Sequence, residues 1–212
     1  MKTFTQEMQA KTTPQAALEL LKEGNQRFIT NSPAIRDLLK QASDTSSGQH
    51  PFAVVLSCID SRTSAELIFD QGIGDIFSIR IAGNIVNEDI LGSMEFACKV
   101  AGSKLIVVLG HSQCGAIKGA CDHVELGNLT TLIDKISPAV AEETTEQTNR
   151  SSSNINFVEN IAAINVRKSV NDIMEKSPIL KAMIDSGECG IVGGMHDIAT
   201  GEVSFYEDTL NP

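Results

Sequence analysis

The sequence predicts an α/β fold with a central, mostly parallel sheet flanked by helices, and with an N-terminal helical extension. Short apolar runs rich in valine occur at 52–57 and 104–110, and such runs are typical of central parallel strands buried on both faces. Segments with helical spacing alternate with these runs, which is the pattern of successive strand–helix units. The segment before the first run, at about 1–45, contains a helical pattern and no strand signal.

The N-terminal helix is predicted to begin at Thr13 and Pro14. Threonine is a suitable N-cap, and proline is favoured at the first helical position. Its apolar face is expected to contain Leu18, Leu21 and Phe28. The polar segment from about 30 to 50 predicts a surface connection.

The rest of the chain alternates between the two kinds of pattern. Strands are expected at 52–57, 75–83, 104–110, 189–197 and 202–207, and helices at 64–72, 88–102, 114–125 and 155–176. Inward positions of the helix at 88–102 are expected to be Ile90, Met94, Ala97 and Val100. Residues 139–154 are polar and contain no aromatic side chain, so an exposed connection, helical at its start, is expected there.

The chain of 212 residues suits a single domain, 1–212, with a helical arm at about 1–45. Its formal net charge of −10 argues against nucleic acid as a partner, because phosphate binding needs clustered Lys and Arg, and against attraction to an anionic membrane. No segment predicts a signal peptide or a membrane span, so a cytoplasmic protein is expected. Five cysteines, an odd number, do not predict a disulfide framework.

Reactive side chains follow two of the predicted strands. Cys58, Asp60 and Arg62 follow the run at 52–57, and His111 and Cys114 follow the run at 104–110. Ligands of α/β proteins bind beyond the carboxyl ends of the strands, so these groups converge if the two strands are neighbours. Two thiolates and one imidazole form a three-ligand zinc set, and three ligands with one open position are the catalytic pattern.

Each of these signals has an ordinary alternative. A cysteine at a strand end is usually a small buried residue, and the HxxC spacing of His111 and Cys114 occurs often by chance. Asp60 and Arg62 can form a routine loop ion pair. The combination of both clusters at the same end of two buried strands favours a catalytic zinc site, with Asp60 or water in the fourth position.

Four stretches resemble the β-class carbonic anhydrase family in order along the chain: SCIDSR, RIAGNIV, GHSQCGA and VGGMHDIATGEV. The resemblance covers roughly residues 14–206. It implies a Zn²⁺ enzyme that hydrates carbon dioxide reversibly, giving bicarbonate and a proton by attack of a zinc-bound hydroxide. It also implies a homodimer or a dimer of dimers (a homotetramer).

The resemblance assigns roles to the clustered residues. Cys58, His111 and Cys114 are the implied zinc ligands. Asp60 and Arg62 are the implied catalytic pair, in which the carboxylate orients the nucleophile and the guanidinium keeps that carboxylate ionised.

The resemblance also implies a narrow substrate pocket. Phe77, Phe96 and Gly115 are expected to line it, and Gln49 is expected to reach in from a partner subunit. Phe96 stands where the family often has Tyr, and Ile81 stands where Asn is usual. The alternatives are core packing for the two Phe residues and an ordinary loop position for Gln49.

Some bacterial members of that family bind bicarbonate at a second site built from Trp, Arg and Tyr, and the aspartate then moves onto zinc. Arg80 matches the Arg, whereas Val55 and His196 stand at the Trp and Tyr positions. An open form with Asp60 paired to Arg62 is therefore expected, and Asp60 as a fourth ligand in a closed form is the alternative.

The other cysteines and histidines have simpler interpretations. Cys98, Cys121 and Cys189 are expected to be buried apolar residues. His50, His123 and His196 are candidates for proton relay, with an ordinary surface position as the favoured alternative for each.

Three rival functions remain open on sequence grounds. One is hydrolysis of carbonyl sulfide or carbon disulfide on the same scaffold. Another is a non-catalytic zinc-binding assembly module. The third is a Cys–His nucleophilic hydrolase, which needs no metal.

Overall fold

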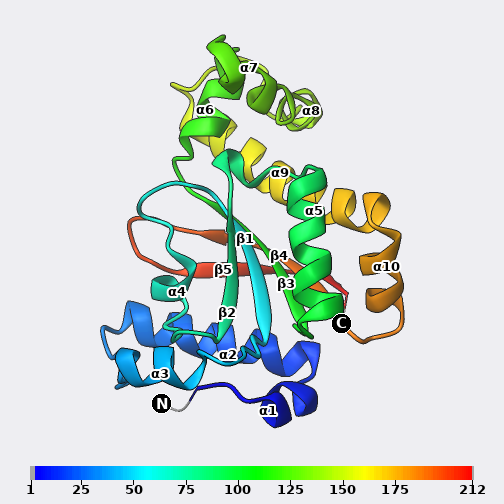
Figure 1. Cartoon of the computed structure of the whole chain (residues 1–212). Coiled ribbons are helices and arrows are strands. Elements are labelled where there is room, and N and C mark those ends of the chain that lie inside the picture. The colour runs from blue at the N-terminus through cyan, green and yellow to red at the C-terminus, as the bar shows by residue number, and fades with distance from the viewer. Residues whose placement is uncertain (1–2, 212) are drawn as a thin grey trace.

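The computed structural model describes residues 3–211, and a five-stranded sheet forms its centre (Figure 1). The strands are β1 (Ala53–Ser57), β2 (Ile76–Arg80), β3 (Leu105–His111), β4 (Gly190–His196) and β5 (Val203–Asn211). Their order is β2-β1-β3-β4-β5, with β5 antiparallel to β4 and all other pairs parallel. The predicted α/β fold with a mostly parallel sheet is confirmed.

The two apolar runs are the central strands, as predicted. Every residue of β1 and of β3 is buried, because helices cover both faces of the sheet. The strands are neighbours in parallel register, with Ser57 beside Leu109. Their carboxyl ends therefore lie at the same edge of the sheet.

Helices precede, connect and follow the strands along the described chain. They are α1 (Gln6–Lys11), α2 (Pro14–Ile29), α3 (Leu38–Asp44), α4 (Ala65–Ile68), α5 (Glu88–Glu95), α6 (Gly115–Cys121), α7 (Gly127–Asp134), α8 (Ser137–Glu142), α9 (Ile155–Lys176) and α10 (Pro178–Asp185). A 3₁₀ turn spans Ala82–Asn84 and a π-helical turn spans Phe96–Val100.

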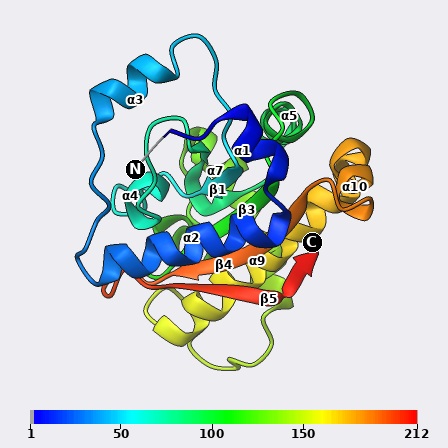
Figure 2. The same ribbon diagram turned by 90° about the horizontal axis from the view of Figure 1, so that it is seen from below.

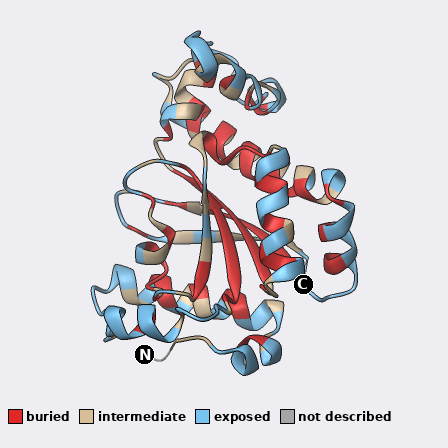
Figure 3. Ribbon diagram, viewed as in Figure 1, coloured by how far each residue is buried: buried red, intermediate tan, exposed pale blue. Residues whose placement is uncertain are grey.

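The helices form two layers and a cap. Helices α2 and α4 pack on one face of the sheet, and Figure 2 shows α2 lying across it. Helices α5, α9 and α10 pack on the other face. Helices α6, α7 and α8 gather with the start of α9 beyond the carboxyl end of β3 (Figure 1). Figure 3 shows the buried strands at the centre and the exposed residues on the outer sides of the helices.

Several element boundaries differ from the sequence prediction. Helix α3 lies inside the segment expected to be a surface connection, and α1, α7 and α10 were not predicted as separate helices. The helix expected at 64–72 is only α4, whereas β5 continues to Asn211. Residues 139–154 begin in α8, as expected, but Glu143 within them is buried.

Two predicted core positions are wrong. Val100 is 72% exposed, because the helix after Glu95 widens into a π turn and the helical spacing no longer applies. Phe28 is 40% exposed, since it lies in the last turn of α2. No helix among residues 3–211 is long and apolar enough to cross a membrane. That the chain forms one domain, 1–212, stays a prediction, and residues 1–2 and 212 lie outside the described part.

Close packing of α2 against the segment after α4 gives a test of this arrangement. A Cβ built on Gly24 would lie 1.8 Å from the backbone oxygen of Phe69. Gly24→Ala is therefore expected to lower the free energy of unfolding by about 3 kcal/mol or more in urea titrations. The matched control is Gly92→Ala in α5, where a Cβ meets nothing within 4 Å. That variant is expected to gain about 0.5–1 kcal/mol, and equal losses in both would contradict the packing.

Candidate metal centre and active site

Three side chains with soft donor atoms converge at the carboxyl edge of the sheet. Cys58 follows β1, His111 is the last residue of β3, and Cys114 is the N-cap of α6. All three are buried, and one ligand atom from each lies within 4.8 Å of the others. The two sulfur atoms are 4.0 Å apart. The predicted convergence follows from the adjacency of β1 and β3.

The imidazole of His111 has one nitrogen free for a ligand. Its Nδ1 lies 2.9 Å from the carbonyl oxygen of Ser112, a geometry that assigns the proton to Nδ1. Its Nε2 is buried and has no hydrogen-bond partner among the described residues. An unpaired buried nitrogen beside two thiols is costly unless something binds it, and the Cys₂His donor set is one that zinc prefers. The residues present therefore fit a zinc ion.

The pKa shifts of the two thiols also favour a bound cation. Contact with the Cys114 thiol, followed by His111 and the Gly83 N–H, lowers the pKa of Cys58. The pKa of Cys114 is raised, first by its contact with Cys58 and then by burial. Loss of the proton from Cys58 is thus favoured. Loss of the proton from Cys114 is then opposed by the negative charge on Cys58. A cation between the sulfur atoms would offset that repulsion.

Asp60 and Arg62 form a bidentate ion pair beside these thiols. The Nε of Arg62 donates to Oδ1 at 2.9 Å, and its Nη2 donates to Oδ2 at 2.8 Å. This pairing holds the pKa of Asp60 well below its usual range. The Oδ2 atom also lies 4.0 Å from Nε2 of His111. The expected pairing of Asp60 with Arg62 is therefore present, next to the nitrogen that is free for a ligand.

Arg80 contributes in a way that sequence reasoning missed. Its guanidinium donates to the carbonyl oxygens of Cys58, at 3.0 Å, and of Asp60, at 2.6 Å. It thereby holds the backbone that carries both side chains. The sequence indicated Arg80 only as part of a second anion site. That Arg80 lies beside Ser57, at the end of the neighbouring parallel strand, becomes known only from the order of the strands in the sheet.

His196 is not a surface residue, which corrects the favoured interpretation. It ends β4 directly beside His111, it is buried, and its Nδ1 has no hydrogen-bond partner among residues 3–211. Burial, and next the neighbouring His111, lower its pKa to about 4. A pKa that low does not suit proton relay near neutral pH. His123 is exposed, and His50 is half-buried before β1.

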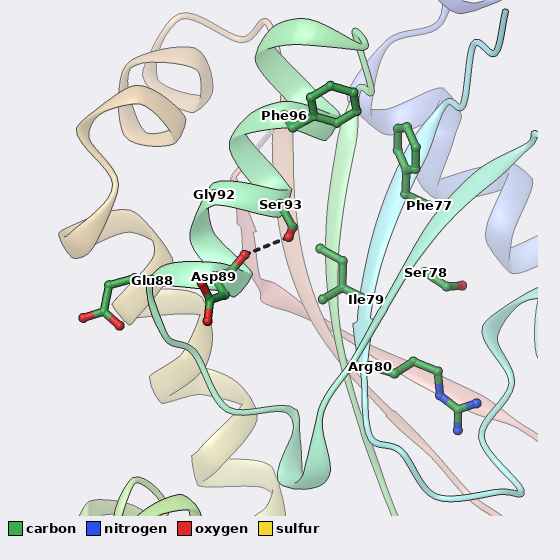
Figure 4. A pocket seen from close by; sticks show the side chains of 9 residues that line it. All are labelled: Phe77, Ser78, Ile79, Arg80, Glu88, Asp89, Gly92, Ser93 and Phe96. Carbon is green, nitrogen blue, oxygen red and sulfur yellow. Dashed lines mark hydrogen bonds between the residues drawn. The ribbon is translucent and has the colours of Figure 1, made fainter.

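The other expected pocket residues are not all brought to the thiols. Phe77 and Phe96, with ring centroids 6.2 Å apart, line a cavity of about 790 Å³ between the outer edge of β2 and α5 (Figure 4). None of the candidate zinc ligands lines this cavity. Phe96 is half exposed, so ordinary core packing does not describe it. Only Gly115, the exposed first residue of α6, lies next to the thiol cluster.

Gln49 lies at the far end of the sheet from the thiol cluster. It is exposed and precedes the first residue of β1, whereas Cys58 follows the last. A strand of this length spans about 16 Å. Gln49 therefore does not reach the cluster of its own chain.

The remaining cysteines are buried, as predicted. Cys98 and Cys189 have their sulfur atoms 3.6 Å apart in the core. Cys121 is also buried, and burial raises its pKa to about 11. These thiols lie outside the cluster of three ligands.

Comparison with known proteins identifies the family. A family model described as carbonic anhydrase matches residues 53–203. The chain belongs to the carbonic anhydrase family. Carbonic anhydrase 2 of Mycobacterium tuberculosis is 34% identical over 206 residues, which cover 94% of this chain and 96% of that protein. A carbonic anhydrase of Mycolicibacterium smegmatis is 33% identical, with 92% and 94% covered.

Solved structures place it in the β class of carbonic anhydrases. The β-carbonic anhydrase CcaA superposes with a TM-score of 0.70 at 27% identity, with 89% of this chain and 87% of that chain covered. CafA of Aspergillus fumigatus, also a β-carbonic anhydrase, gives 0.71 at 25% identity, with 93% and 92% covered. The resemblance noted from the motifs is thus confirmed, and the chain is a lyase of the carbonic anhydrase type.

Proposed function

We propose that this carbonic anhydrase catalyses the reversible hydration of carbon dioxide to bicarbonate and a proton, with zinc held by Cys58, His111 and Cys114. The observation that carries the proposal is the position of the Asp60–Arg62 pair, 4.0 Å from the imidazole nitrogen that is free for a ligand. A purely structural metal site does not need an ionised carboxylate at that position.

Zinc bound by these three side chains would hold a water in the position that the protein leaves open and would lower the pKa of that water. The protein's own contribution is orientation. Asp60, kept ionised by two hydrogen bonds from Arg62, accepts a hydrogen bond from the attacking oxygen and so fixes the direction of its lone pair. Arg80 holds the carbonyl oxygens of Cys58 and Asp60, so the loop that carries both keeps its shape. Asp60 as a fourth ligand requires that it leave Arg62.

We further propose a homodimer or a dimer of dimers in which Gln49, Phe77 and Phe96 serve the site of a second copy. In the single chain these residues lie away from the thiol cluster, and β2 is an edge strand with no strand paired to its outer side among the described residues. Two β-carbonic anhydrases of Sordaria macrospora are described as tetrameric; one of their chains gives a TM-score of 0.67 at 25% identity. The superposed region covers 79% of this chain and 89% of the Sordaria chain.

A cytoplasmic location is also proposed. All five cysteines are free thiols, as is usual in a reducing compartment. The net charge of −10 argues against nucleic acid as a partner.

The test is stopped-flow hydration of carbon dioxide by the zinc-loaded protein, with its mass in solution measured on the same sample. Fast hydration that is lost after treatment with dipicolinate and restored by zinc is expected. Activity that survives chelation would favour a thiol nucleophile, which needs no metal. Zinc-loaded protein without hydration would contradict the proposal. Turnover of carbonyl sulfide or carbon disulfide would then identify the sulfur hydrolase, and inactivity on every substrate the assembly module.

A further inference from the structure

The turn at Ala82–Asn84 delivers a hydrogen bond to one of the candidate zinc ligands. The N–H of Gly83 donates to Sγ of Cys58 at 3.3 Å. Gly83 has φ +68° and the next residue, Asn84, has φ +42°, so two consecutive residues are left-handed. Asparagine in that region costs energy, and a side chain at Gly83 would lie 2.7 Å from Ile136. Such a turn persists only when its surroundings hold it.

Two buried polar side chains of α9 hold this turn. Nδ2 of Asn165 donates to the carbonyl oxygen of Gly83 at 2.9 Å, and Oγ of Ser169 donates to that of Asn84 at 3.2 Å. The two residues are one turn apart on the helix, and both are buried. Polar groups on a buried helix face need such partners, which are here the carbonyls of the turn.

The same helix holds the turn between the other two candidate ligands. Gln113, between His111 and Cys114, is also left-handed, with φ +58°. Its N–H donates to Oε1 of Glu159 at 2.9 Å. Nζ of Lys118, in α6, donates to the side-chain oxygen of Gln113 at 2.6 Å. Helix α9 therefore contacts both turns that bring the two sulfur atoms together.

We propose that Asn165 is a positioning residue of the metal centre, which holds the Gly83 turn so that its N–H stays on Cys58, and that Ser169 and Glu159 support it. The proposal rests on the proposed zinc site. Partners outside the ligand set orient the ligands and set the charge on them, and their loss typically costs about 10–100-fold in metal affinity. A hydrogen bond from an N–H group to a ligating sulfur withdraws charge from that sulfur. Loss of the hydrogen bond therefore changes the electronic energy of the sulfur as well as its position.

The test uses Co²⁺ as a spectroscopic probe in the full chain. Asn165→Ala is expected to lower Co²⁺ and Zn²⁺ affinity by about 10–100-fold. It is also expected to shift the near-ultraviolet sulfur-to-cobalt band to longer wavelength, because the sulfur loses its hydrogen bond. Ser169→Ala should give smaller changes in the same direction. Asn171→Ala, on the exposed face of the same helix, is the matched control and should change neither.

The outcomes separate this inference from the function on which it rests. A wild-type chain without a sulfur-to-cobalt band would refute the metal site itself. A normal wild-type band with an unchanged affinity and band in folded Asn165→Ala protein would overturn the positioning role alone. If circular dichroism shows that Asn165→Ala is unfolded, Ser169→Ala decides: a shifted band supports the role and an unshifted one overturns it.

Discussion

Cys114→Ala is expected to abolish zinc binding and to lower kcat/KM for carbon dioxide hydration by at least about 10³-fold. The substitution leaves only Cys58 and His111 of the three donors that lie within 4.8 Å of one another. A catalytic metal contributes several kcal/mol to transition-state stabilisation, and about 4 kcal/mol corresponds to a factor of about 10³. Zinc content by atomic emission and stopped-flow hydration are the measurements.

The matched control for that variant is Cys121→Ala. Cys121 lies at the other end of α6 and is as buried as Cys114, but it is outside the ligand cluster. It is expected to keep full zinc content and near-normal hydration. Zinc retained by Cys114→Ala, or lost equally from both variants, would show that the cluster of Cys58, His111 and Cys114 is not the metal site.

Asp60→Asn is expected to lower kcat by about 10²-fold or more while zinc content stays unchanged. The carboxylate accepts two hydrogen bonds from the Arg62 side chain and lies 4.0 Å from Nε2 of His111. The amide of Asn has one oxygen acceptor and no charge, so the variant loses the ion pair with Arg62 and, with it, the fixed hydrogen bond that orients the attacking oxygen. Loss of the productive orientation of a reacting group can cost about 10²-fold.

The control for this second variant is Asp134→Asn. Asp134 is an exposed carboxylate at the end of α7, and its replacement should leave kcat unchanged. Full hydration activity in Asp60→Asn would rule out the orienting role. A loss of zinc together with activity would instead assign Asp60 to the metal shell.

The strands were predictable because their signals are local. The runs at 52–57 and 104–110 are apolar on both sides, and this burial on both faces is what β1 and β3 show. Within the helix predicted at 88–102 only the core position of Val100 was wrong, because a π turn cannot be read from helical spacing and it rotates Val100 out to solvent. Helix α3 was missed, because its buried residue is the polar Gln41 rather than an apolar stripe.

The candidate site was predictable to the extent that its residues follow strands. Cys58, Asp60, His111 and Cys114 lie at strand ends or just beyond them, and parallel neighbours bring such positions together. Asn165 was not predictable, because it lies 82 residues from its partner Gly83 and only the packing of α9 joins them. His196 looked like a surface histidine because its burial depends on β3 and β5 at its sides.

The sequence by itself determined the order of the strands and of the longer helices between them, the family, and the residues with metal-binding and carboxylate chemistry, because apolar runs, residue types and motif spacing are local properties. Only the tertiary structure decided that the Asp60–Arg62 pair lies beside a free imidazole nitrogen, that Arg80 and α9 hold the ligand turns, and that Phe77 and Phe96 face a different cavity. These relations depend on which strands are neighbours and on the direction in which each runs, and hydrogen bonds between distant segments form only after the sheet and its helices have packed.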